Sequence, residues 1–292
     1  RRELWQAHKE PWVGLFQDWE NDAMWAALAT PGRDRYKMEP IKARIGAGRA
    51  LINSNIPWEH VTFRQLEKGL GPRYRSIYLP AMMCLTSKLV EFLRAYVELG
   101  GRVVLDMPGA WLDERGHLVD TREGSAFEKL FGVVFHEYGY ANNIKPKIDR
   151  VPLEGFTAVM TPTSAKVVKK YDVGGAAITE NKLGKGTAVV LGAAASLGCY
   201  RPGNAAMEHL LAKTALGRHE PPFACRGAIV YRIAAPKADH YFVINDGPAK
   251  RVKLDTRLMR YRKCTDPVSN KVVRLSAIDI ETNSAVWVRC EK

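Results

Sequence analysis

Residues 74–109 read YRSIYLPAMMCLTSKLVEFLRAYVELGGRVVLDMPG, and this stretch decides the fold. An apolar run ends at Pro80, and a second short apolar run fills positions 103–105. Between them, apolar residues recur at i, i+3, i+4 and i+7 from Leu89 to Val97, which is typical of an amphipathic helix. Ser or Thr at 86–87 can cap its start, and two glycines at 100–101 can end it. A strand, a helix and a strand in one compact span predict a βαβ unit, which requires a parallel sheet covered on both faces.

The chain on either side of this unit continues the alternation of strands and helices. Residues 12–16 and 58–62 are expected to form strands, and 41–53 a helix with Ile41, Ile45, Gly48 and Ile52 on one face. Short β-like runs follow between 133 and 173, then a buried-looking strand at 187–191 and a last helix at 205–216. This order favours an α/β fold with a doubly wound, mostly parallel sheet of flavodoxin-like order.

The last quarter of the chain has a different pattern. After Glu220-Pro221-Pro222, short strands recur roughly every ten residues with Gly, Pro, Asn and Asp between them, which predicts a small antiparallel β domain without helices. We therefore expect an α/β domain at 12–218 and a small all-β domain at 219–292, with 1–11 as a linker. The chain begins with Arg-Arg and no Met. Since a large second residue would leave an initiator Met in place, we infer that an upstream region preceded residue 1.

Bulk composition limits the classes of partner. The chain has 292 residues and a net charge of 44 − 31 = +13, but its Lys and Arg residues are scattered, apart from 166–170 and 257–263. Without a nucleic-acid motif, a solvated basic surface is favoured over a nucleic-acid partner. No apolar run approaches the roughly 18–20 residues that span a bilayer, and the first residues lack the apolar core of a signal peptide. We expect a cytoplasmic protein that does not enter a membrane.

The five cysteines are far apart and lack CxxC spacing, so they predict neither a zinc site nor a disulfide framework. We expect reduced, mostly buried thiols, no metal and no cofactor. Cys84 follows a strand and precedes a helix, where an amidotransferase-like nucleophile would sit, and His136 with Glu137 beside it would be its partner. However, Cys84 is flanked by Met83 and Leu85 instead of the small residues that such a turn needs. The context therefore favours a buried structural cysteine.

Three carboxylates follow predicted strands. Asp18 and Glu20 come after the first strand, and Asp106 follows the apolar run at 103–105. In open α/β sheets ligands bind at the carboxyl ends of the strands, so these residues could bind a ligand or do acid–base work. Caps at helix N-termini are the commoner role for such carboxylates. The Gly184-Lys185-Gly186 sequence is expected to be a tight hairpin turn, because it precedes a strand and lacks the upstream glycine of a phosphate loop.

Tryptophans are dense in the first part of the chain, at positions 5, 12, 19, 25, 58 and 111. Aromatic side chains stack on sugar rings, but they also fill cores and subunit interfaces. The core or interface role is the better explanation here. No complete catalytic constellation emerges from the residues alone.

Several stretches, in order, resemble glycoside hydrolase family 42 β-galactosidases. They are WVGLFQDWENDAMWAAL, ALINSNIPWEHV, YRSIYLPAMMCLTSKLVEFLRAYVELGGRVVL, ENKLGKGTAVVLGA and HYFVINDGPAKRVKLD. The resemblance runs from about Trp12 onward and covers the family's middle and C-terminal regions. It implies a trimerisation domain with a class I glutamine amidotransferase-like fold, followed by a β-sandwich, both non-catalytic. The catalytic TIM barrel, which lies N-terminal to them in the family, is not in this sequence.

The resemblance therefore implies a non-catalytic oligomerisation or scaffold portion of a β-galactosidase-like enzyme, in carbohydrate degradation. Its partners would be a TIM-barrel domain or subunit and further copies of the chain, with a trimer expected. Two alternatives stay open. One is a stand-alone amidotransferase-like hydrolase that uses Cys84, and the other is a module that binds acidic polysaccharide through the +13 charge and the tryptophans.

Overall fold

The computed structural model of the chain describes residues 2–28, 38–141, 145–257 and 259–292. The chain divides into two compact units. Unit 1 consists of Arg1–Trp12, Leu51–Trp58 and Arg218–Lys292, and unit 2 consists of Val13–Ala50 and Glu59–Gly217. In the described residues, no helix is both long enough and apolar enough to span a membrane.

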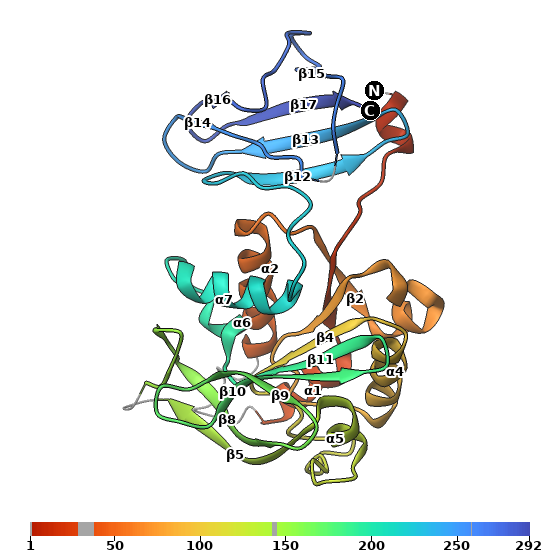
Figure 1. Cartoon of the computed structure of the whole chain (residues 1–292), viewed down its shortest axis with the longest axis vertical. Coiled ribbons are helices and arrows are strands. Elements are labelled where there is room, and N and C mark those ends of the chain that lie inside the picture. Colours follow the sequence, from red (N-terminus) through yellow and green to blue (C-terminus); the bar gives the residue numbers. More distant parts are fainter. Residues whose placement is uncertain (1, 29–37, 142–144, 258) are drawn as a thin grey trace. The chain divides into compact units, whose positions relative to one another are not determined.

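Unit 2 alternates strands and helices in its first half and consists mainly of strands in its second half (Figure 1). Its elements, in chain order, are β1 (Val13–Gln17), α1 (Trp19–Leu28), α2 (Glu39–Asn53), β2 (Trp58–Thr62), α3 (Phe63–Gln65), the π-helical turn η3 (Leu66–Leu70), the 3-10 turn η4 (Gly71–Arg73), β3 (Ser76–Leu79), α4 (Ser87–Glu98), β4 (Arg102–Asp106), α5 (Ala126–Phe131), β5 (Val133–Ala141), β6 (Lys147–Ile148), β7 (Val151–Pro152), β8 (Gly155–Pro162), β9 (Lys166–Lys170), β10 (Ala176–Leu183), β11 (Gly186–Leu191), α6 (Ala195–Gly198) and α7 (Ala205–Leu216).

The centre of unit 2 is a seven-stranded sheet with the order β2-β1-β3-β4-β11-β10-β9. The pairs β1–β3, β3–β4 and β4–β11 are parallel. The pairs β11–β10 and β10–β9 are antiparallel, so the sheet changes direction toward the β9 edge. The predicted α/β fold with a mostly parallel sheet is confirmed.

The βαβ unit predicted at 74–109 is confirmed as β3, α4 and β4. Thr86 caps α4, because its Oγ1 accepts a hydrogen bond from the Leu89 N–H at 3.2 Å. The apolar face of α4 packs with α5 and with Ile77, Leu79 and Val103 on one face of the sheet. Helix α7 packs against β3 and β4 from the other face. The sheet is therefore covered on both sides, as a parallel sheet requires.

Shorter elements complete unit 2. The turn at Gly184 joins β10 to β11 in a tight hairpin, where Leu183 pairs with Gly186, as predicted. Gly184 has a φ of 56°, in the left-handed region that glycine adopts without strain. Strands β5 and β8 form a separate antiparallel pair, as do β6 and β7.

Unit 1 is built from antiparallel strands. It contains the 3-10 helix η1 (Arg2–Gln6), β12 (Ile229–Ala234), β13 (Ala238–Ile244), β14 (Lys250–Val252), β15 (Lys263–Thr265), β16 (Ile278–Ile280) and β17 (Ala285–Glu291). One sheet has the order β12-β13-β17-β15, and β14 pairs with β16 in a second. The N-terminal segment joins this unit, because Glu3 accepts hydrogen bonds from the Arg289 guanidinium at 2.7 and 3.1 Å.

Candidate functional site

The carboxyl ends of β1, β3 and β4 meet at one edge of the sheet of unit 2. Because these strands are parallel, they place Asp18, Ala81 and Asp106 at the same edge. This is the edge where, from the sequence, carboxylates could bind a ligand or cap a helix. The structure divides the predicted residues here into two groups.

The first group surrounds Asp106, whose side chain is completely buried. Its carboxylate accepts hydrogen bonds from the Tyr78 hydroxyl at 3.0 Å, the Ala81 N–H at 2.6 Å and the Ser196 N–H at 2.8 Å. Burial raises the pKa of Asp106 to about 6, although these donors act in the opposite direction. The carboxylate is thus enclosed by three donors of its own chain, which ties the end of β4 to the turn after β3 and to α6.

The turn after β3 has an unusual backbone. Ala81 has a φ of 46°, in the left-handed region that alanine rarely adopts. Its N–H is held by Asp106, and its carbonyl accepts hydrogen bonds from Asn21 at 3.3 Å and the Trp25 indole at 3.2 Å. These three contacts hold the strained residue in place.

Cys84 lies three residues beyond this turn and is fully buried. Its backbone N–H donates to Asn21 at 3.0 Å, and its Sγ lies 3.5 Å from the Asp113 carbonyl oxygen. Burial and, to a lesser extent, the nearby carboxylates, first Asp18, raise the pKa of the Cys84 thiol to about 12. Since the thiolate is the nucleophilic form, this environment opposes activation. All five cysteines are free of disulfides, and Cys264 is the one that is partly exposed, which confirms the prediction of mostly buried thiols.

The second group pairs Asp18 with Glu20. Asp18 is buried, whereas Glu20 is exposed at the start of α1. Burial, together with the hydrogen bond to Glu20, raises the pKa of Asp18 to about 7. The same hydrogen bond lowers the pKa of Glu20. The two carboxyl groups therefore share a proton near neutral pH, close enough to Cys84 to disfavour its thiolate.

His136 and Glu137 lie on β5, outside this edge cluster. Both are exposed, and the Nε2 of His136 lies 2.8 Å from the Thr161 hydroxyl on β8. In the described residues, the contacts of Cys84 run to Asn21 and Asp113 and not to His136. The structure thus brings Asp18, Glu20 and Cys84 together and leaves His136 and Glu137 apart from them.

The sequence did not reveal the hydrogen-bond partners of Asp106 and Cys84 at this edge. Asn21, Tyr78 and Ser196 lie 63, 28 and 90 residues from the groups they contact, so no local pattern identifies them. The one local signal is the order of Asp18 and Asn21 across the first turn of a helix that follows a strand. In the described residues, no group of three or more His, Cys, Asp or Glu side chains is arranged to hold a metal ion.

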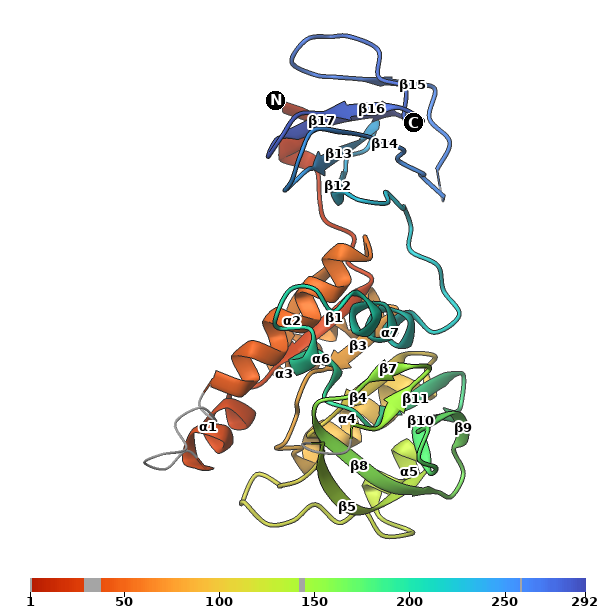
Figure 2. The same ribbon diagram turned by 90° about the vertical axis from the view of Figure 1, so that its left-hand side faces the viewer.

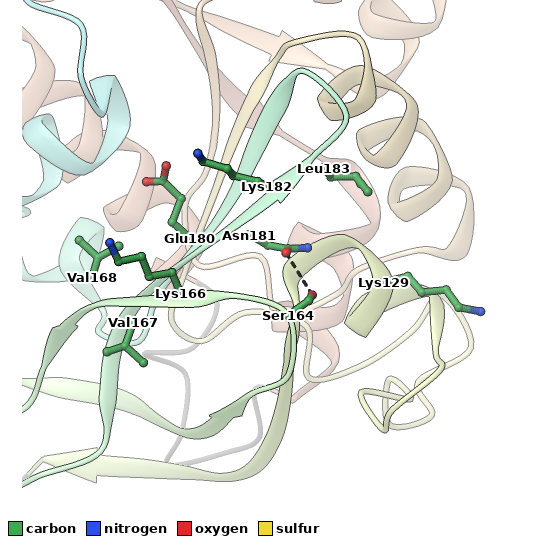
Figure 3. A pocket seen from close by; sticks show the side chains of 9 residues that line it. All are labelled: Lys129, Ser164, Lys166, Val167, Val168, Glu180, Asn181, Lys182 and Leu183. Carbon is green, nitrogen blue, oxygen red and sulfur yellow. Dashed lines mark hydrogen bonds between the residues drawn. The ribbon is translucent and has the colours of Figure 1, made fainter.

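A pocket of about 780 Å³ lies elsewhere in unit 2, beside β9, β10 and α5 (Figure 3). Three lysines line it, namely Lys129, Lys166 and Lys182. At its wall Ser164 donates to the Asn181 side-chain oxygen at 3.1 Å. Glu180 is already paired with Arg102 at 3.3 Å. Figure 3 shows Lys129 pointing away from Lys166, so the ammonium groups do not converge on one point.

The tryptophans take different roles. In unit 2, Trp25 is buried and Trp111 stacks on Tyr138 with ring centroids 5.5 Å apart. Trp19 is 81% exposed at the start of α1. Trp5, in unit 1, is also exposed. The expectation of core or interface roles therefore holds for the two buried or stacked rings and leaves the exposed ones to be explained.

Known structures share this fold at low sequence identity. A catalytic mutant of Gan42B, a GH42 β-galactosidase from G. stearothermophilus, is 18% identical with a TM-score of 0.76, over 97% of this chain and 40% of that one. A β-galactosidase from Bacillus circulans sp. alkalophilus is 16% identical with a TM-score of 0.78, over 99% of this chain and 44% of that one. An α-L-fucosidase isoenzyme 2 from Paenibacillus thiaminolyticus is 12% identical with a TM-score of 0.68, over 99% and 50%. This chain thus spans half or less of the length of each of these proteins.

No curated protein matches the sequence. The model of one protein family, described as the β-galactosidase trimerisation domain, matches residues 13–218. That span covers most of the chain and all of unit 2. The chain therefore belongs to the β-galactosidase trimerisation domain family.

Proposed function

We propose that this chain is the non-catalytic assembly portion of a β-galactosidase-like glycoside hydrolase, which holds subunits together around a TIM barrel. The observation that carries the proposal is the family match over residues 13–218. The barrel would lie upstream or on another chain. The structural relatives support this part, because more than half the length of the two β-galactosidases lies outside the region that this chain covers.

The residues at the carboxyl edge of the sheet support a non-catalytic role. In a nucleophile elbow, the reactive side chain stands on the strained residue of a strand-to-helix turn. In this chain the left-handed residue after β3 is Ala81, which carries only a methyl group. Cys84, three residues further on, is buried and has a raised pKa. An amidotransferase-like site therefore lacks both an exposed nucleophile and an activated one, and neither this reading nor the acidic-polysaccharide reading is supported by the family match.

We also propose finer descriptions of the two units. In the sheet of unit 2, five neighbouring strands have the order β2-β1-β3-β4-β11, which supports a flavodoxin-like, amidotransferase-like fold in which the second strand lies outside the first. In unit 1, one apolar core includes Val243 and Val288 from the four-stranded sheet and Val252 and Ile278 from the β14–β16 pair. That shared core supports a small β-sandwich. The family match over residues 13–218 supports domain boundaries of 12–218 and 219–292, whereas the division into units places Arg1–Trp12 and Leu51–Trp58 with the C-terminal strands.

The test measures hydrolysis and association together. The 292-residue chain is purified alone and with the polypeptide encoded immediately upstream, and both are assayed on a nitrophenyl β-galactoside. We expect no hydrolysis by the chain alone, hydrolysis by the combination, and co-elution of the two. Glutaminase or amidase activity that is lost in Cys84→Ala would overturn the proposal. So would a chain that neither associates with itself nor with the upstream polypeptide.

A further inference from the structure

Helix α2 packs against the rest of unit 2 through its smallest residues. Ala43, Ala47 and Ala50 are fully buried. Gly46 lies so close to α6 that a Cβ added there would be 2.0 Å from the Ser196 carbonyl oxygen and 2.7 Å from the Tyr200 nitrogen. The backbone of α2 therefore lies directly on its neighbour, and the helix cannot rotate to bury a larger side chain at this contact.

The opposite side of α2 is apolar and faces solvent. Ile41 is 38% exposed and Ile45 is 48% exposed. Between residues 39 and 50 these two are the exposed positions of the helix, and neither is polar. A surface helix normally places charged and polar side chains on this side. The two isoleucines thus form an apolar row that the described residues of this chain do not cover.

Helix α1 repeats the arrangement. Its Trp25 points inward and is buried. Trp19, Ala23 and Ala26 are exposed, at spacings of i, i+4 and i+7 along the other side of the helix. Residues at these spacings share one helix face. The exposed indole of Trp19 therefore stands at one end of a second apolar row.

The two rows belong to one surface. Arg44 of α2 forms a bidentate ion pair with Asp22 of α1, at 2.6 and 2.9 Å. Trp25 of α1 and Ala43 of α2 share one buried apolar cluster. These contacts fix α1 beside α2 at the margin of unit 2 (Figure 2). We call the exposed surface of Trp19, Ala23, Ala26, Ile41 and Ile45 the α1–α2 face.

Among the described residues, two ion pairs within the chain border the α1–α2 face. Asp22 pairs with Arg44, and Glu39 pairs with Lys42 at 2.9 Å. Glu20 shares a hydrogen bond with Asp18. The chain as a whole carries a net charge of +13, so two copies repel each other over most orientations. Two closed ion pairs and the negative charge of Glu20 make this surface one where positively charged copies can approach each other at low electrostatic cost.

We propose that the α1–α2 face is the surface through which copies of this chain associate with one another. The inference rests on the proposed assembly function and deepens it by naming the surface. Its occupant is a second copy of the chain, because the described face is apolar and exposes no unpaired positive charge, and because the family is described as a trimerisation domain. A closed ring of three copies requires two different parts of the surface to meet, and the rows on α1 and α2 provide two such parts.

Sedimentation equilibrium of the full 292-residue chain tests the inference. The variant Ile41→Glu/Ile45→Glu places two charges on the face, and Leu99→Glu is the matched control, because Leu99 is 82% exposed at the end of α4. We expect the wild type and Leu99→Glu to have three times the single-chain mass of 32.7 kDa. The double Glu variant is expected to have the single-chain mass. An unchanged mass of the double variant would overturn the inference.

A second variant guards against a loss of folding. Ile41→Ala/Ile45→Ala keeps the face uncharged, and alanine favours helix more than isoleucine does. We expect unchanged far-UV circular dichroism and at least a tenfold higher concentration at the midpoint of association, on the order of what two truncated apolar contacts contribute. An unchanged midpoint would overturn the inference.

The outcomes separate this inference from the proposed function. If the wild type and the double Glu variant are both trimers, the surface is wrong and the assembly function stands. If the wild type is a single copy that binds the upstream polypeptide through this face, the occupant is wrong and the inference falls. If the wild type is a single copy that binds neither, the inference and the proposed function fall together.

Discussion

Asp106 has a structural role at the carboxyl edge of the sheet. It follows a strand in the position where many α/β proteins bind a ligand, yet its oxygens are occupied by Tyr78, Ala81 and Ser196. Those donors come from three separate parts of the chain. Asp106 therefore connects elements of unit 2 and holds the strained Ala81, and its side chain is completely buried.

Cys84 is expected to resist alkylation in the folded protein. Its thiol is buried and its pKa is raised to about 12 by burial and by the neighbouring carboxylates, so little thiolate forms near neutral pH. Iodoacetamide labelling at pH 8, followed by peptide mass spectrometry, measures this. Cys264 is the internal comparison, because it is partly exposed and a hydrogen bond from Cys290 lowers its pKa. Labelling of Cys84 as fast as that of Cys264 would contradict the structural role.

The Asp18–Glu20 pair is expected to make stability depend on pH. The folded-state pKa of Asp18 is about 7, well above the ordinary value for the unfolded chain. The folded protein therefore holds a proton that the unfolded chain has released, and this stabilisation is lost as the pH rises through about 7. We expect the free energy of unfolding to fall by about 2 kcal/mol between pH 5 and pH 8.

Urea unfolding of the wild type and of Asp18→Asn over this pH range measures the effect. The amide cannot release a proton, so the variant is expected to show a flatter profile. If the two profiles run parallel from pH 5 to pH 8, then Asp18 does not hold the proton.

At the scale of elements, the sequence predicts those helices, strands and turns that are determined by residues close together in the chain. The βαβ unit of β3, α4 and β4 has its helical spacing, its Thr86 cap and its terminal glycines within one span of sequence. The hairpin at Gly184 is equally local. The order of the sheet, the donors of Asp106 and the left-handed Ala81 depend on contacts between distant residues, which no local pattern contains.

For helix α2, the spacing of apolar residues predicts the helix but does not predict which side of it is buried. The spacing of Ile41, Ile45 and Gly48 marks one apolar side of the helix. The structure buries the adjoining alanines and Gly46 against unit 2, and Ile41 and Ile45 remain exposed. Hydrophobicity alone ranks isoleucine above alanine for burial, but close approach of the backbone to Ser196 leaves no room for a larger side chain.

Gly46→Ala is expected to destabilise the protein, although alanine is the better helix former. Its Cβ would meet the Ser196 carbonyl and the Tyr200 nitrogen, which are backbone atoms that cannot rotate away. We expect a loss of about 2 kcal/mol or more in urea unfolding, as for overpacked cores. Gly198→Ala in α6 is the control, because its Cβ would lie 3.4 Å from the flexible Met207 side chain. Equal stabilities of the two variants would show that α2 has room to move.

For the whole molecule, the net charge of +13 and the apolar α1–α2 face act in opposite directions on self-association. Salt screens the repulsion between positively charged copies and leaves apolar contacts in place. We expect the concentration at the midpoint of association to fall when NaCl rises from about 0.05 M to about 0.5 M, as the Debye length shortens. Light scattering over a range of protein concentrations measures this midpoint. A higher midpoint at high salt would mean that the contact depends on opposite charges.

The mass of the 292-residue chain in solution tests the central claim most directly. Sedimentation equilibrium at moderate salt gives this mass without assumptions about shape. An assembly domain of the β-galactosidase trimerisation family is expected to show three times the single-chain mass of 32.7 kDa. A mass of one chain at every concentration, unchanged when the upstream polypeptide is added, would contradict it.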